Sequence, residues 1–127
     1  MNIQNKQLKQ TIDFLDSLDM EGQASVGRTN LKELLDKTLE EFTRNQITII
    51  DEFNGWTNRE EAHFTESNSE MNQALNKLAN TVVDVTFASP FKSALAEAVE
   101  NYPAKLSGEK ADTYALLYEQ LILKEDD

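Results

Sequence analysis

A long apolar stripe in the first half of the chain constrains the fold more than any other feature. Between about residues 26 and 54, apolar side chains recur mostly at intervals of three, four or seven residues: Leu31, Leu34, Leu35, Leu39, Phe42, Ile49, Ile50 and Phe53. This spacing places them on one face of an α-helix that other parts of the protein must cover. Thr38, Asn45 and Gln46 interrupt the stripe, which favours packing against the chain's own helices over a long parallel coiled coil.

The ends of this long helix have recognisable signals. Gly22 separates it from an earlier helix, and the turn over 20–25 leads to Ser25 or Thr29 as its N-cap. Gly55 is expected to end it, next to the single tryptophan, Trp56.

Helices are also predicted before and after this segment. Asn5 is a candidate N-cap for a first helix, in which Leu8, Ile12, Leu15 and Leu18 recur at helical spacing. Ser89-Pro90 is a start signal for a later helix that Tyr102-Pro103 ends, because Ser caps helices and Pro fits the first helical position. Ser107 opens a last helix, whose Tyr114 and Tyr118 are expected to line the core with their hydroxyls at its edge.

Residues 57–80 carry two competing start signals. Thr57 to Glu60 and Ser67 to Glu70 each fit a capping box, so one bent helix and two short helices are both open.

Residues 81–87 change character, since Val83, Val85 and Phe87 alternate with polar neighbours as in a half-buried strand. We expect a minor two-stranded ribbon of this segment with residues 1–4, and pairing with a second subunit is the alternative.

Together these patterns predict a mainly α protein: a single helical domain over residues 1–127, built as a compact bundle of four to six helices with one long central helix. A chain of 14.4 kDa supports one hydrophobic core. No stretch approaches the length of a membrane-spanning helix, and the N-terminus lacks the apolar run of a secretory signal. We therefore expect a cytoplasmic protein that does not bind membranes.

The charge of the chain restricts its partners. Its 23 Asp and Glu against 12 Lys and Arg give a formal charge of −11. Direct contact with nucleic acid would be repelled. The carboxylates are either an ordinary solvated surface or an imitation of phosphates that occupies a basic site on another protein.

Catalytic and metal-binding patterns are scarce. The chain has no cysteine and one histidine, His63, which forms an E-x-x-H pair with Glu60 that is only half of a di-iron carboxylate motif. The adjacent acidic pairs at 40–41, 51–52 and 60–61 diverge by about 100° on a helix and are interpreted as solvated faces. We expect no metal, no cofactor and no enzymatic activity.

Arginine and tryptophan are the more informative polar and aromatic residues. Arg28 lies near a predicted helix N-terminus, where its charge is unfavourable, so we expect Asp19, Glu21 or an acidic partner to hold it. Trp56 is either a core plug or an interface anchor. The candidate interaction residues are Arg28, Arg44, Glu40, Glu41, Asp51, Glu52, Trp56, Glu60 and Glu61.

Three stretches resemble a family of small proteins of unknown function from tailed phages and prophages of Gram-positive bacteria. They are Ile3-x-Asn5 with Leu8 and Phe14-Leu15, Gly22-x-Ala24-Ser25-x-x-Arg28-Thr29, and Leu106-Ser107-Gly108-Glu109-x-Ala111-x-x-Tyr114. The resemblance covers both ends of the chain better than residues 56–80. It implies a phage origin and a helical body, and it supplies no reaction or catalytic residue.

Two functions follow as hypotheses. The first is a non-enzymatic phage interaction protein, such as an assembly or accessory structural factor, in the host cytoplasm or associated with the virion, with self-association open. The second is an acidic inhibitor or nucleic-acid mimic that binds a host defence or nucleic-acid-binding protein.

Overall fold

The structure, a computed structural model, describes residues 1–123 and is mainly helical. Its five α-helices are α1 (Leu8–Ser17), α2 (Gly22–Glu52), α3 (Ser69–Asn80), α4 (Lys92–Glu100) and α5 (Gly108–Tyr118). A 3-10 turn (Asn5–Gln7) precedes α1, and a π-helical turn (Glu119–Leu123) extends α5. Four short strands form two ribbons: β1 (Asn2–Gln4) with β4 (Val82–Asp84), and β2 (Trp56–Asn58) with β3 (His63–Phe64). The predicted fold class is confirmed.

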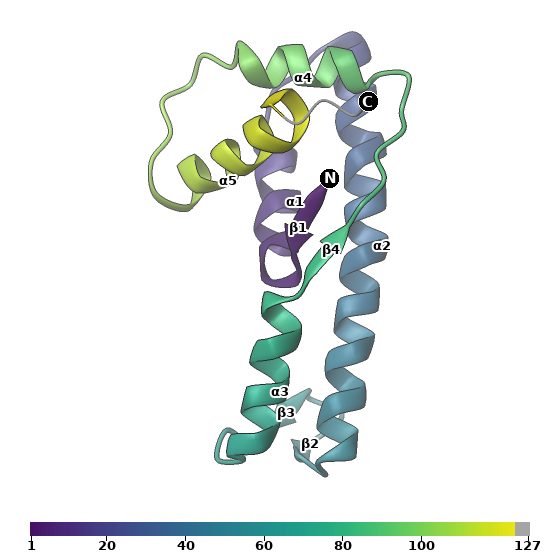
Figure 1. The fold of residues 1–127 in the computed structure, drawn as a ribbon, viewed down its shortest axis with the longest axis vertical. Helices are drawn as coiled ribbons and strands as arrows, with labels where there is room; N and C mark the ends of the chain where they lie inside the picture. The colour runs from purple at the N-terminus through teal and green to yellow at the C-terminus, as the bar shows by residue number, and fades with distance from the viewer. Residues whose placement is uncertain (124–127) are drawn as a thin grey trace.

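The long helix α2 runs along the whole length of the molecule, and different elements pack against its two halves (Figure 1). Its N-terminal half packs against α1 and α4, with α5 on α1 and α4, and these elements form the body of the protein. Its C-terminal half runs antiparallel to α3, and the β2–β3 hairpin closes the far end. We call residues 51–70, which join α2 to α3 through this hairpin, the tip.

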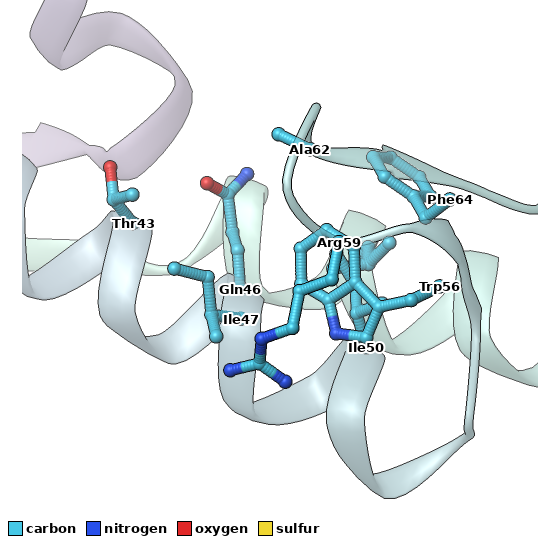
Figure 2. A pocket seen from close by; sticks show the side chains of 9 residues that line it. Thr43, Gln46, Ile47, Ile50, Trp56, Arg59, Ala62 and Phe64 are labelled. Atoms are coloured by element: carbon cyan, nitrogen blue, oxygen red, sulfur yellow. The ribbon is translucent and has the colours of Figure 1, made fainter.

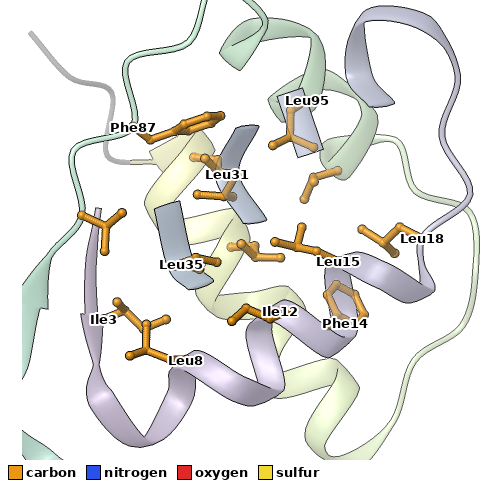
Figure 3. Close-up of a cluster of buried hydrophobic side chains, with 14 residues drawn as sticks. Ile3, Leu8, Ile12, Phe14, Leu15, Leu18, Leu31, Leu35, Phe87 and Leu95 are labelled. Atoms are coloured by element: carbon orange, nitrogen blue, oxygen red, sulfur yellow. The ribbon is translucent and has the colours of Figure 1, made fainter. Parts of the chain in front are cut away.

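The main hydrophobic core lies in the body (Figure 3). Its fully enclosed side chains come from segments far apart in sequence and include Leu8, Leu15, Leu31, Leu35, Leu95 and Leu117. Ile50 and Met71 are also buried but lie in the distal half, between α2 and α3. The α2 stripe is therefore covered by the body at one end and by α3 at the other.

The β1–β4 ribbon pairs the N-terminal residues with the segment between α3 and α4. Ile3 pairs with Val83 in an antiparallel register, and the N-terminal ammonium contacts the Asp84 carboxylate at 3.3 Å. The predicted ribbon is confirmed, with the strand shorter than 81–87. Val85 and Phe87 continue past it into the core.

The long helix starts earlier and ends earlier than predicted. It begins at Gly22, four residues before the expected start, so the connection from α1 is only residues 18–21. Neither Ser25 nor Thr29 is its N-cap; both lie inside the helix, and the Thr29 hydroxyl donates to the Ser25 carbonyl. At the other end, Asn54 takes a left-handed conformation with φ of 50°, which ends the helix at Glu52 just before Gly55.

The capping box predicted at Thr57 to Glu60 is wrong, because these residues belong to the β2–β3 hairpin. The Asn58 side chain accepts a hydrogen bond from the Glu61 amide at 3.2 Å, and this closes the turn instead of capping a helix. A single helix, α3, follows. Its N-cap is Asn68, whose side chain accepts from the Met71 amide at 3.0 Å, so the Ser67 to Glu70 box is displaced by one residue.

Two other predicted starts are shifted by similar local hydrogen bonds. The Asn5 side chain donates to the Leu78 carbonyl at 3.0 Å rather than capping α1. The Ser89 hydroxyl accepts from the Phe91 amide at 3.0 Å in a turn, after which α4 begins at Lys92. Ser107 is the N-cap residue of α5 as predicted.

Candidate functional site

A pocket of about 300 Å³ opens beside the tip, where α2, the β2–β3 hairpin and α3 meet (Figure 2). Its wall is mostly hydrocarbon. From α2 it takes Thr43, Gln46, Ile47 and Ile50, from the hairpin Trp56, Arg59, Ala62 and Phe64, and from α3 Leu75. Its volume lies at the lower end of the range of about 300–1,000 Å³ that is usual for ligand pockets.

Helical spacing and strand pairing explain how these side chains converge. Thr43, Ile47 and Ile50 follow one another at four and three residues, so they share one face of α2. Trp56 and Phe64 are paired across the hairpin, and their rings meet edge to face with centroids 6.5 Å apart. The hairpin thus holds two aromatic rings against an aliphatic helix face, and 39% of Phe64 is exposed.

The Asp51 carboxylate organises the outer side of the pocket. The Trp56 indole N–H donates to Asp51 Oδ1 at 2.6 Å, and the Arg59 guanidinium forms an ion pair with the same oxygen. The guanidinium carbon lies 5.4 Å from the centre of the Trp56 ring, within cation–π distance. The Trp56 hydrogen bond lowers the pKa of Asp51, partial desolvation of the carboxylate opposes this, and Arg59 lowers the pKa further.

A small buried cluster of Gly55, Ile50 and Met71 supports the hairpin where it leaves the end of α2. Gly55 lies under Met71 so closely that an added Cβ would come within 2.4 Å of the Met71 sulfur. The Gly55 carbonyl accepts from the Thr65 amide at 2.7 Å, and its own amide donates to the Ile50 carbonyl at 2.9 Å. The absence of a side chain at Gly55 therefore lets α3 and the hairpin pack onto the end of α2.

Negative charge is concentrated at the tip. Residues 51–70 contain six carboxylates and one arginine, a formal charge of −5 out of −11 for the whole chain with His63 neutral. Glu52, Glu60, Glu66 and Glu70 are exposed and form no ion pair with another residue in the range 1–123. The tip that carries the apolar pocket is therefore acidic, and these four carboxylates are uncompensated.

The structure brings together five of the predicted interaction residues. Asp51 and Trp56 touch each other, and Glu52, Glu60 and Glu61 are exposed on the same tip. Glu60 and His63 do not share a helix face as the E-x-x-H spacing suggested, because both lie in the hairpin. The nearer carboxylate is that of Glu61, 3.7 Å from His63.

The other four predicted residues lie elsewhere. Glu40, Glu41 and Arg44 are exposed in the middle of α2. The prediction that a carboxylate such as Asp19 or Glu21 holds Arg28 is wrong. Its guanidinium instead donates to the Leu18 carbonyl and, at 3.5 Å, to the Ser25 hydroxyl. Leu18 is the C-cap of α1, so Arg28 binds at the negative end of that helix dipole. Because α2 begins at Gly22, Arg28 lies in the second turn of α2 and not near its N-terminus as predicted.

Sequence reasoning missed Arg59 and Phe64 as site residues. The available signal was weak: two aromatic residues, Trp56 and Phe64, flank a polar segment that contains a single turn-forming residue, Asn58. The capping-box interpretation of the same residues concealed it.

Within residues 1–123, no group of three or more His, Asp or Glu side chains is arranged to hold a metal ion. None of the helices in this range is both long and apolar enough to cross a bilayer. Comparisons with protein families, curated proteins and solved structures found no match to the chain.

Proposed function

We propose that this protein is a non-enzymatic interaction protein encoded by a phage, and that it binds a protein partner through the tip. The observation that carries the proposal is the apolar pocket beside Trp56 and Phe64, open to solvent at the end of the molecule opposite the body core. The phage setting rests on the resemblance of the two ends of the chain to phage and prophage proteins.

The composition of the site is that of a binding surface. Tryptophan and arginine are enriched among the residues that contribute most to protein–protein binding, and aromatic side chains in partly dry pockets are typical anchors. Trp56 and Arg59 are held in place by Asp51 before any partner arrives, which reduces the entropy lost on binding.

The chemistry of the pocket wall also favours binding over catalysis. The pocket's charged lining residue, Arg59, is engaged with Asp51. The single histidine of the chain, His63, has a side chain that is 68% exposed and is not part of the wall. The site therefore offers contact area and charge rather than a nucleophile and a base.

A role as an assembly or accessory structural factor, in the host cytoplasm or on the virion, is the form of this function that we propose. An acidic inhibitor would use the same tip. However, carboxylates are scattered over every α-helix as well as the tip, and scattered charge does not favour a single footprint as long as a nucleic acid.

Site-specific photo-cross-linking tests the proposal. A p-benzoylphenylalanine replaces Thr57, which is exposed on β2, and in a matched control it replaces Ala115, which is exposed on α5 in the body. In lysates of phage-infected Gram-positive cells, the probe at Thr57 should cross-link a discrete protein, and Phe64→Ser should abolish that product. Equal labelling from both positions, or labelling that persists in Phe64→Ser, would contradict a partner-binding tip.

A further inference from the structure

We infer that the segment recognised by the tip is a basic peptide that inserts a bulky aliphatic side chain into the pocket and places Lys or Arg against exposed carboxylates of the tip. This inference rests on the proposed function and specifies the chemistry of the partner.

The pocket selects an aliphatic anchor. Ile47, Ile50 and Leu75 form its aliphatic wall, and Trp56 and Phe64 add the faces and edges of two rings. A volume of about 300 Å³ accommodates one or two side chains of a peptide rather than a large cofactor. Burial of apolar surface in this pocket supplies the affinity.

The acidity of the tip selects positive charge. Arg59, the tip's one Lys or Arg, is already bound to Asp51, so it does not neutralise the other carboxylates of the tip. The exposed carboxylates available to an approaching Lys or Arg include Glu60 in the hairpin, Glu66 in the loop after it and Glu70 in the first turn of α3. Such charges at a binding surface chiefly govern the association rate and the choice of partner.

Arg59 also shows how a guanidinium fits at this surface. It lies over an indole ring while its N–H groups contact a carboxylate, an arrangement for which arginine is better suited than lysine. The tip therefore contains one example of the contact that we infer for the partner.

Charge argues against the other occupants. A second copy of the chain would bring two tips of −5 together, and a nucleic acid or an anionic membrane would be repelled. A neutral small molecule would make no use of the four glutamates that lack an ion pair.

Selection from a random library tests the inference without assuming a sequence. Displayed 12-residue peptides are selected on the immobilised full-length protein and counter-selected on Thr43→Phe, which places a ring at the mouth of the pocket. The matched control Thr48→Phe adds the same ring at an exposed position of α2 that does not line the pocket. Circular dichroism verifies that both variants are folded.

We expect the enriched peptides to carry an aliphatic residue flanked by Lys or Arg. Because Trp56 is the single tryptophan, its fluorescence reports directly on binding of the synthetic peptides. Affinity should fall at least tenfold in Thr43→Phe, and it should stay within twofold of the wild type in Thr48→Phe.

Paired neutral substitutions test the inference that the carboxylates of the tip attract a basic peptide. Glu60→Gln with Glu61→Gln removes two charges at the tip, and Glu97→Gln with Glu100→Gln removes two exposed charges from α4 at the opposite end. The tip pair should weaken binding severalfold and flatten its salt dependence, and the α4 pair should change neither.

Enriched peptides that are acidic, or that lack an aliphatic anchor, would overturn the inference, as would no enrichment at all. If the selection fails while the Thr57 probe still captures a partner, the proposed function stands and only the partner chemistry is refuted. If the tip-dependent cross-link is also lacking, both fail.

Discussion

Gly27 lies where α2 closely approaches the start of α4, and replacing it tests the packing that we describe. It is a buried residue of α2, where an added Cβ would lie 2.6 Å from the Phe91 carbonyl oxygen and 3.1 Å from Leu95 Cβ. That carbonyl accepts the hydrogen bond of the Leu95 amide at 3.1 Å at the start of α4. The obstacle is therefore anchored backbone and not a flexible side chain.

Two opposing terms set the magnitude for Gly27→Ala. Alanine improves helix propensity by about 1 kcal/mol. Overpacking a core costs about 1–3 kcal/mol, and the upper part of that range applies because α4 itself must move. We expect a net loss of about 1–2 kcal/mol in the free energy of unfolding, or a melting temperature lower by roughly 3–8 °C.

Urea denaturation followed by circular dichroism at 222 nm measures this loss. Thr29→Ala, at an exposed position on the same helix, is the matched control and should stay within about 0.5 kcal/mol of the wild type. A Gly27→Ala protein as stable as the wild type, or more stable, would refute the close contact between α2 and α4.

Three further predictions concern single side chains. Tyr114→Phe should cost about 0.5–1.5 kcal/mol in urea denaturation, because the Tyr114 hydroxyl donates at 2.6 Å to a backbone carbonyl of α4, and Tyr118→Phe provides a comparison. Met71→Ala removes a fully buried side chain and should cost about 2–5 kcal/mol, with the Trp56 fluorescence transition moving to lower urea than the loss of helix. The pKa of Asp51 is lowered in the folded protein, so its stabilising contribution is present above the ordinary pKa of aspartate and is lost as pH falls through the lowered value. Acid titration of Trp56 fluorescence should therefore show a midpoint below the ordinary pKa of aspartate, and Asp51→Asn should remove that transition.

Much of the body could be predicted because its signals are local. The α2 stripe, the Ser107 cap and the alternation at Val83 and Val85 each depend on residues within a few turns of one another. Side-chain periodicity determines which face of a helix or strand must be buried. The type of each of these elements could therefore be predicted, although the helix ends were displaced by a few residues.

The tip could not be predicted in the same way. Thr57 to Glu60 satisfies the sequence requirement for a capping box. Short polar side chains can accept a hydrogen bond from a backbone amide in a turn as well as at a helix N-terminus, and here Asn58 accepts from the Glu61 amide and closes a hairpin turn. The pairing of Trp56 with Phe64 and the hydrogen bond of Trp56 to Asp51 stabilise the hairpin, and neither contact is visible as a helical or strand period.

The sequence by itself determined a mainly helical protein with an acidic surface, since periodicity and charge are properties of composition and spacing. Only the tertiary structure decided that Trp56 and Arg59, both bound to Asp51, line an apolar pocket, because its walls come from α2, the hairpin and α3. The orientation of α2, the hairpin and α3 relative to one another depends on the packing around Gly55 and Met71. It does not follow from the local conformational preference of any one of these segments.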